Sequence, residues 1–495
     1  MPIMDEPTSL DPQIADSNSE KLVAANCYEG LVRIMADGTI GKGVATDWNI
    51  SGDGLTYTFK LRNNSHWAMF SGHKAVLGEN YEDTFDITVK AEDFKFGIER
   101  TLSEQTGSAD APLFSAVKSI STPDDFTIVF NLSYADDNFL YALTNPGAMP
   151  CDEEFFNLTN GKYGLDAKYL LCNGPFHVSK WTEKTSVKLV KNNEYNGESS
   201  VSPSSVTFYI NNNDSEVADK MNSVTYDVAF LSSSQFSSIE NKKDLNSVAV
   251  QNVTYSFIFN QNDNNYRNKN MRLAFCRSCD TSSLFDSQSD ISKADGIVPP
   301  SCKIGGEDYR NGNAAELLSY DETLAKKNFN DALLELGSSS VETTILCTEQ
   351  YESFVKQMVQ KLQKTLGVKF VSTVKVVSES DLEAAVNDGN YSVAFYPFKA
   401  KSSFAGEIIE GFDQNNIFGY ESDVLSQKIR NIKNNSGSLE GERSAVADAE
   451  NYLVSEAVIM PVFYENSYFV TSKKTSGIYF YSSADNVCFI NAKKS

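Results

Sequence analysis

Side chains able to perform covalent chemistry are sparse and scattered in this sequence. It contains three histidines, His66, His73 and His177, in 495 residues. No HExxH zinc motif, GxSxG nucleophile turn or GxxxxGKS/T phosphate-binding loop is present. Spacing leaves a Cys–His or Ser–His pair open but singles none out. The pattern therefore favours a protein that is not an enzyme, and it predicts no cofactor.

The cysteines do not follow a metal-binding or disulfide-scaffold pattern. Eight occur, at positions 27, 151, 172, 276, 279, 302, 347 and 488. Cys276 and Cys279 form a lone CxxC, for which unligated thiols or a structural disulfide are favoured over zinc. Cys151 and Cys172 flank residues 152–171, and a disulfide between them is compatible with an exported protein. The turn Asn211–Glu216 lacks the glycine and distal glutamate of an EF-hand loop, so no metal is predicted.

The net charge narrows the range of partners. The chain has 66 acidic and 43 basic residues, a formal net charge of −23. Such a chain is repelled by nucleic acid and by anionic membrane surfaces, so neither is expected as a partner. No apolar run reaches the roughly 18 residues that a membrane span requires. The N-terminus opens without a signal peptide, so we expect either a cytoplasmic protein or one whose export signal has been removed.

The elements that must position any site alternate between strands and helices. Period-two alternation predicts strands at 55–62, 126–132, 206–210 and 253–259, and apolar runs predict strands at 368–371 and 458–464. Amphipathic spacing predicts helices at 91–102, 324–336, 354–366 and 445–453. Polar, breaker-rich loops are predicted at 192–205, 211–216, 260–270, 285–315 and 432–442. This interleaving indicates a mixed α/β protein, and its length implies two or three lobes.

Several motifs carry a family resemblance through their order and spacing. They are Glu6–Pro12 (EPTSLDP), Tyr28–Leu31 (YEGL), Ser51–Arg62 (SGDGLTYTFKLR), Trp67, Ala91–Phe94 (AEDF), Asn173–Phe176 (NGPF), Phe259–Asn260, Met271–Phe275 (MRLAF) and Ala445–Tyr464. Together they resemble the family 5 extracellular solute-binding proteins, the oligopeptide and dipeptide receptors of ABC transport. The resemblance runs from about residue 6 to about residue 490. An insertion at about 70–88 departs from the pattern, and Lys90 stands where the family often places a helix-capping threonine.

The resemblance implies an α/β, bilobal periplasmic-binding-protein-like fold, in its large three-domain type II form with hinged lobes. Domain I would be discontinuous and comprise 1–45, 172–262 and 466–495. Domain II would comprise 46–171, and domain III, the second lobe, 263–465. The resemblance also implies an extracytoplasmic protein, either periplasmic or a Gram-positive cell-surface lipoprotein, that hands its ligand to ABC permease subunits. We expect a monomer, because lobe closure needs no second copy.

The function that the resemblance implies is the capture of short peptides in an interlobe cleft. Backbone groups of the cleft would satisfy the N–H and C=O groups of an extended peptide, and hinge closure would bury it. Carried over by position, the ligand-binding residues are Ala15, Asp16, Ser17, Asn18, Phe230, Leu231, Ser232, Phe398, Lys399, Lys401 and Tyr464. An ordinary polar loop at 15–18 and a core tyrosine at 464 are the alternatives.

One position departs from the peptide receptors of this family in a way that bears on the ligand. Many of them have G-W-x-A-D where this chain has Pro397–Lys401 (PFKAK), and the aspartate pairs with the α-ammonium group of the peptide. Lys401 reverses that charge, and an unpaired buried charge is costly. We therefore hypothesise that Lys399 or Lys401 holds an anionic group of the ligand. The alternatives are that both lysines face solvent or that the alignment is shifted by a few residues.

Three other functions remain open from the sequence. The same fold could bind a non-peptide ligand such as an oligosaccharide, an opine or a metal chelate, which Lys401 favours. A receptor that senses a signal peptide without transport is the second. The third is a hydrolase that uses cleft carboxylates such as Asp16, which would need a second acid nearby.

Overall fold

The protein divides into two compact units. The computed structural model describes the whole chain except residues 36–38, 137, 198–199, 282–283, 286–289, 400–403, 414–415, 436–437 and 482–485. Unit 1 comprises Met1–Ala249 and Tyr468–Ser495, and unit 2 is the continuous segment Val250–Ser467. The finer division into three domains stays a prediction. Within the described ranges, no helix is both long and apolar enough to cross a membrane.

One layer of unit 1 is an antiparallel sheet whose strands alternate as the sequence predicts. Its strands, in spatial order, are β4 (Ala45–Ile50), β5 (Thr56–Leu61), β7 (Thr127–Leu132) and β6 (Val117–Asp124). Tyr57, Phe59 and Leu61 of β5 are buried, and Phe59 meets Phe130 of β7 edge-on with ring centroids 5.8 Å apart. The predicted strands at 55–62 and 126–132 are therefore confirmed.

Helix α4 (Ala91–Leu102) packs on this sheet and confirms the predicted helix at 91–102. As expected, the Lys90 side chain provides no cap. Asp93 compensates, because its carboxylate accepts the Lys90 N–H at 2.7 Å and so fixes the start of the helix.

The second sheet of unit 1 begins its strand β8 (Phe176–Thr182) directly after a segment that passes very close to helix α1 (Asn18–Cys27). Its strands are β1 (Pro2–Ile3), β10 (Ser205–Ile210), β9 (Ser186–Lys191) and β8. Just before β8, Gly174 passes so close to the end of α1 that an added Cβ would lie 2.6 Å from the Tyr28 nitrogen. The glycine of the NGPF motif is thus required by this close approach.

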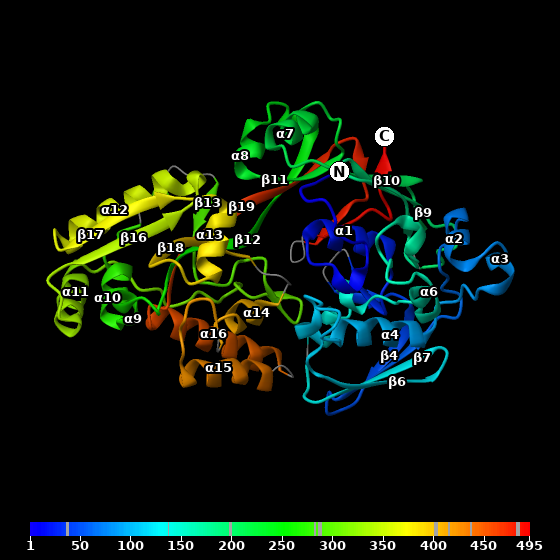
Figure 1. Cartoon of the computed structure of the whole chain (residues 1–495), viewed down its shortest axis with the longest axis horizontal. Helices are drawn as coiled ribbons and strands as arrows, with labels where there is room; N and C mark the ends of the chain where they lie inside the picture. The colour runs from blue at the N-terminus through cyan, green and yellow to red at the C-terminus, as the bar shows by residue number, and fades with distance from the viewer. Residues whose placement is uncertain are drawn as a thin grey trace. The chain divides into compact units, whose positions relative to one another are not determined.

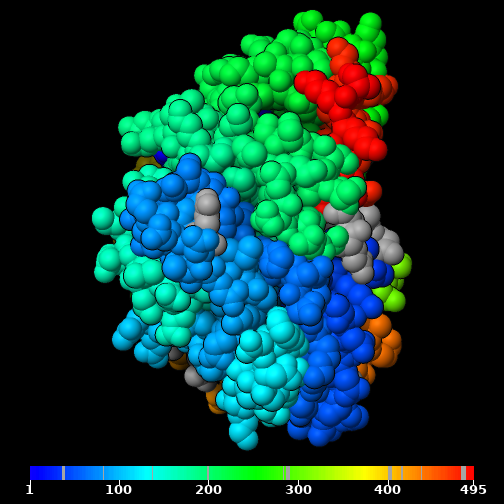
Figure 2. Space-filling model, turned by 90° about the vertical axis from the view of Figure 1, so that its right-hand side faces the viewer, coloured from blue at the N-terminus to red at the C-terminus, as the bar shows by residue number. Residues whose placement is uncertain are grey.

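The C-terminal segment completes unit 1 by packing against α1. Asn26 donates a hydrogen bond to the Val487 carbonyl at 2.8 Å and accepts one from the Phe489 N–H at 3.2 Å, which fixes strand β22 (Asn486–Cys488) beside the helix. Figure 2 shows the last residues, drawn red, lying among segments from the first half of the chain. The three tryptophans, Trp48, Trp67 and Trp181, all belong to unit 1.

Unit 2 is a sheet with helices on both faces. The strand order is β19 (Ile459–Ser472), β12 (Leu245–Phe259), β18 (Val393–Lys399), β16 (Val341–Cys347) and β17 (Phe370–Val376). One face packs against α10 (Lys269–Arg277), α11 (Glu322–Leu336) and α12 (Glu352–Leu366). The other packs against α13 (Glu379–Asn387), α14 (Ala405–Glu410), α15 (Asp423–Asn434) and α16 (Leu439–Ser455). Because both faces are covered, successive residues of β12 such as Phe257 and Ile258 are all buried.

The chain crosses from one unit to the other twice, each time within a strand. The division falls between Ala249 and Val250 in β12 and between Ser467 and Tyr468 in β19, which are neighbours in the sheet order. Both strands are visible in Figure 1. Two adjacent extended segments, rather than a flexible loop, therefore link the units covalently.

Two expectations about loops and cysteines are corrected. The predicted loop at 260–270 contains the short helix α9 (Asn264–Arg267) and the start of α10, because Asp263 and Asn268 cap the two helices. The suggested disulfide between Cys151 and Cys172 is absent, and both are buried free thiols. The Cys151 Sγ atom instead accepts a hydrogen bond from the Arg100 guanidinium, with 3.5 Å between sulfur and nitrogen.

The insertion predicted at about 70–88 carries a buried histidine that makes stability depend on pH. His73 donates from Nε2 to the Leu170 carbonyl at 3.1 Å and packs against Phe70 and Phe155. Burial lowers its pKa from 6.5 to about 4. The unfolded chain therefore takes up this proton first, and stability falls as the pH drops from 6.5 towards 4, by about 3 kcal/mol in full.

We expect His73→Gln to flatten this part of the stability profile. Unfolding midpoints measured between pH 4 and 7 should fall less steeply in the variant than in the unchanged protein. Parallel profiles that differ only by a constant offset would show that His73 does not cause the loss.

Candidate ligand-binding site

The first predicted ligand-binding segment, 15–18, is a loop held in shape by Glu20. The Glu20 carboxylate accepts hydrogen bonds from the N–H groups of Asp16 at 3.0 Å and Ser17 at 3.1 Å, and from the Thr8 N–H at 2.7 Å. Ser17 Oγ accepts the Glu20 N–H in return, which completes a capping box for α1. Burial alone would raise the pKa of Glu20, but the hydrogen bonds outweigh it and hold the pKa below its usual value.

The same loop is anchored at its start by a buried ion pair. Arg100 on α4 forms two hydrogen bonds with the Asp11 carboxylate, the shorter at 2.6 Å, and a third with Gln13 Oε1 at 2.6 Å. Its guanidinium lies 4.1 Å from the centroid of the Phe156 ring. The EPTSLDP motif thus fixes the position of residues 15–18. Among these residues, Asp16 and Asn18 are exposed and Ala15 is buried.

The second predicted segment, Phe230 to Ser232, ends strand β11 (Val228–Ser232) and begins helix α8 (Ser233–Ser238). Leu231 is buried in the core, whereas Phe230 is half-buried with ring centroids 5.3 Å from Phe469 and 5.0 Å from Phe480. Ser232 caps α8 by accepting the Gln235 N–H at 3.2 Å. Strand alternation therefore leaves Phe230 and Ser232, but not Leu231, on the accessible side.

The third predicted segment lies at the end of β18 in unit 2. Phe398 is half-buried and packs against Phe412 and Phe418, with ring centroids 5.8 and 5.7 Å away. Lys399 is exposed at the last position of the strand. Lys401 lies outside the described residues.

Tyr464 occupies a buried position on β19. Its hydroxyl accepts the Asp295 N–H at 3.1 Å and donates to the Val298 carbonyl at 3.4 Å, and burial raises its pKa to about 12. In the sheet, β12 separates its strand from β18, which carries Phe398. The structure thus places Phe398 and Lys399 side by side and Tyr464 two strands away, facing the segment around residue 295.

That segment is fixed by a glutamate which was not among the predicted residues. Glu450 on α16 is ion-paired with Arg310 and accepts hydrogen bonds from the N–H groups of Ile297 and Val298 at 2.7 and 2.9 Å, and from the Tyr309 hydroxyl at 3.0 Å. Five donors on one buried carboxylate hold the 294–310 chain beneath Tyr464. No local spacing could reveal this residue, since its partners are about 140 positions away.

Glu20, in contrast, had a local signal. Ser17 and Glu20 have the S-x-x-E spacing of a capping box, which predicts the reciprocal hydrogen bonds that the structure contains.

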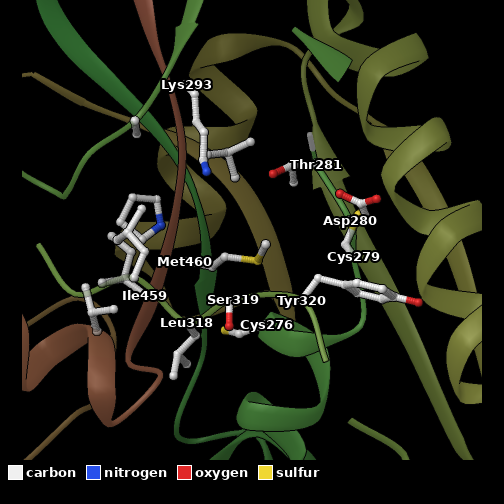
Figure 3. Close-up of a pocket in the computed structure, with 15 residues that line it drawn as sticks. Cys276, Cys279, Asp280, Thr281, Lys293, Leu318, Ser319, Tyr320, Ile459 and Met460 are labelled. Carbon is white, nitrogen blue, oxygen red and sulfur yellow. The ribbon is translucent and has the colours of Figure 1, made fainter. Parts of the chain in front are cut away.

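Each unit also contains a cavity that the predicted residues do not line. Unit 2 has one of about 200 Å³ between the end of α10, the 317–320 chain and the start of β19. Figure 3 shows Lys293 extending into it, with Asp280 and Cys279 on the opposite wall. Unit 1 has one of about 210 Å³ bordered by Tyr28, Glu29 and the C-terminal segment. No histidine lines either cavity.

The predicted segments carry groups that can contact a ligand. In the part of the chain that the structure describes, no three His, Cys, Asp or Glu side chains are placed to hold a metal ion together. The predicted segments instead offer strand ends, helix starts, exposed polar groups and half-buried aromatic rings, which suit hydrogen bonding and apolar contact with a ligand.

The fold matches solved binding proteins over essentially its whole length. A dipeptide-binding protein from Pseudoalteromonas sp. SM9913, solved with Met-Leu, gives a TM-score of 0.79 at 18% identity and covers 100% of this chain and 99% of its own. AgaA from A. tumefaciens R10, solved with agropinic acid, gives 0.74 at 17% identity, with 99% and 97% covered. The two-unit α/β architecture is therefore that of the periplasmic-binding-protein class.

The sequence comparisons specify the family within that class. Residues 39–418 match the model of the bacterial extracellular solute-binding proteins, family 5, and the chain belongs to this family. The dipeptide-binding protein DppE of Bacillus subtilis is 24% identical over 496 aligned residues, which cover 96% of this chain and 88% of DppE. OppA of B. subtilis, an oligopeptide-binding protein, is 26% identical over 74% of this chain and 68% of its own. Membership implies an extracytoplasmic solute-binding protein of an ABC importer, a family of binding proteins rather than enzymes.

Proposed function

We propose that this protein captures short peptides in a cleft between its two lobes and delivers them to the permease of an ABC importer. The observation that carries the proposal is the full-length similarity to DppE, which is named for dipeptide binding. The similarity to OppA, which is named for oligopeptide binding and aligns with about three quarters of the chain, also supports peptides as the ligand class. The proposed lining comprises residues 15–18 and 230–232, together with Phe398, Lys399, Lys401 and Tyr464.

The mechanism needs binding and closure but no bond cleavage. Strand ends such as that of β11 can pair with the backbone of an extended ligand regardless of its side chains. Bending within β12 and β19 would let the lobes close, because only these two strands carry the chain between the units. We further propose that the protein acts as a monomer, catalyses no reaction and is a cell-surface lipoprotein.

Native mass spectrometry of the purified protein, followed by denaturation and identification of what is released, tests the proposal. A heterogeneous set of short peptides is the expected result. A single non-peptide mass would refute peptide capture. If no ligand is released, the protein is titrated with a dipeptide library and with a tetrapeptide library by calorimetry. Absence of binding heat in both titrations would also refute peptide capture.

Lys401 provides a sharper test of how the ligand is held. If its ammonium group binds a ligand anion, Lys401→Ala should weaken binding of the released ligand about 10- to 100-fold, the loss of one charge-assisted hydrogen bond. Calorimetry measures the change, with Lys399→Ala as the matched variant. Unchanged affinity in both variants would show that the anion lies elsewhere.

A second candidate function is the binding of a non-peptide anionic ligand by the same cleft. It is favoured by the lysines at 399 and 401 in place of an acidic residue, and by the agropinic acid complex of AgaA. A single released compound with carboxylate groups would support it.

A further inference from the structure

The cavity of about 200 Å³ in unit 2 is built from segments of that unit alone. The end of α10 and the residues after it form one wall, the 317–320 chain a second, and the start of β19 a third. Strand β13 (Ile291–Lys293) supplies its last residue, Lys293, to the lining. None of the residues proposed to bind the peptide lines this cavity, so it is a separate site.

Backbone hydrogen bonds hold these walls together. The Asp321 N–H donates to the Arg277 carbonyl at 3.1 Å, which ties the 317–320 chain to the end of α10. The Ala294 N–H donates to the Val462 carbonyl at 3.1 Å, which ties the residue after Lys293 to β19. The walls therefore keep their spacing through the folded backbone, and the cavity does not depend on the rotamer of one side chain.

The lining combines an apolar surface with a single lysine. Figure 3 shows the Lys293 side chain extending into the cavity towards its centre. In the part of the chain that the structure describes, no carboxylate pairs with this ammonium group. The apolar part of the lining consists of Leu317, Leu318, Val454, Ile459, Met460, Pro461 and Val462. A cation beside such a surface favours an anion that carries an apolar body.

Two neighbouring residues on the wall opposite Lys293 restrict the charge of that anion. The Thr281 hydroxyl lies on the side of this wall that faces Lys293, where it can donate a second hydrogen bond (Figure 3). The Asp280 carboxylate lies on the same wall, and Lys361 of α12 fixes its backbone by donating to the Asp280 carbonyl at 2.6 Å. A second negative group on the ligand would be repelled by Asp280, so the lining favours one negative charge.

We propose that this cavity binds a small monocarboxylate with an apolar body about the size of benzoate. Lys293 and Thr281 hold the carboxylate, and the apolar body packs against Met460, Leu318 and Pro461. An apolar protein cavity of about 150 Å³ accommodates benzene, so the larger volume here leaves room for a ring and its carboxylate. The site needs only unit 2 and does not rest on peptide capture.

Fluorine NMR of 4-fluorobenzoate titrated into the full-length protein tests the proposal. Saturable broadening of the ligand signal is expected. The neutral isostere 4-fluorobenzamide should bind about 10-fold more weakly, because it lacks the charge that Lys293 attracts. The dianion 2-fluoroterephthalate should also bind more weakly, because its second carboxylate meets Asp280. A lack of saturable binding, or equal affinity for the benzoate and the benzamide, would overturn the proposal.

Variants locate the binding event. Lys293→Met should weaken 4-fluorobenzoate binding about 10- to 100-fold, and the exposed position of Lys293 makes loss of folding unlikely to follow. Ser319→Phe, also at an exposed position, should weaken it by filling the cavity. Lys399→Ala is the matched control and should bind as the unchanged protein does. Unchanged affinity in both the Lys293 and the Ser319 variants would place the carboxylate elsewhere and overturn the assignment. Peptide binding is measured separately by calorimetry, so the failure of either proposal can be told from the failure of the other.

Discussion

Replacing Glu450 by glutamine is expected to lower the free energy of unfolding of unit 2 by about 3–5 kcal/mol. The carboxylate is 1% exposed, and the Arg310 side chain with which it pairs is 8% exposed. Glutamine keeps the size of the side chain but removes the charge, so the buried guanidinium is left without its counter-charge. Whichever way the amide turns, its NH₂ group lies where an acceptor is needed, either by the N–H groups of Ile297 and Val298 or by the Tyr309 hydroxyl.

Hydrogen exchange of unit 2 peptides in increasing urea measures this loss. Peptides from α16 and from 294–310 should exchange at lower urea in the variant. Glu322→Gln is the matched control, because Glu322 pairs with Lys326 on the exposed face of α11, where water screens the two charges, and its loss should leave the exchange profile unchanged. A Glu450 variant that unfolds together with the control would show that the network does not stabilise the unit.

Asp11→Asn should destabilise unit 1 by a similar mechanism, with about 3 kcal/mol lost. Arg100 would keep its contact with the Phe156 ring and with Gln13 but lose its charge partner inside the protein. The 15–18 loop would loosen as well, because Asp11 also accepts the Gln13 N–H at 3.1 Å that begins the turn leading to it. Ligand affinity should therefore fall along with stability if this loop lines the cleft.

Urea unfolding followed by tryptophan fluorescence suits this experiment, since all three tryptophans lie in unit 1. The double variant Asp11→Asn/Arg100→Met removes both charges and should recover part of the loss, which a thermodynamic cycle would quantify. Lys95→Gln, at a half-buried position of the same helix where the lysine pairs with Glu92, is the control. Strictly additive effects of the two substitutions would contradict a direct ion pair.

Local patterns predicted the elements well, because periodicity is a property of short segments. The alternating residues of Leu55–Arg62 predicted β5 almost to its ends, and the apolar face of 354–366 predicted α12. Helix α16 was also expected, but the role of Glu450 on it was not. Its partner Arg310 lies 140 positions away, and only the tertiary fold decides which polar side chain of a helix faces the core.

The ligand-binding residues could be predicted only as segments. The position of a segment along a strand could be carried over from the family resemblance, and 230–232 and 398–399 do lie at strand ends. The orientation of single side chains could not be carried over, because it depends on which face of the strand a neighbouring element covers. Leu231 and Tyr464 are buried in their own units for this reason, and whether any of these residues touches a ligand stays a prediction.

Because the chain crosses between the units within β12 and β19, the two units are completed at different points of synthesis. Unit 2 is one uninterrupted stretch, so all of its sheet is available as soon as Ser467 has been synthesised. Unit 1 must wait longer, since Asn26 finds its partners Val487 and Phe489 only at the far end of the chain. Contacts so distant in sequence form slowly. The half of the protein that is begun first is therefore the last to be completed.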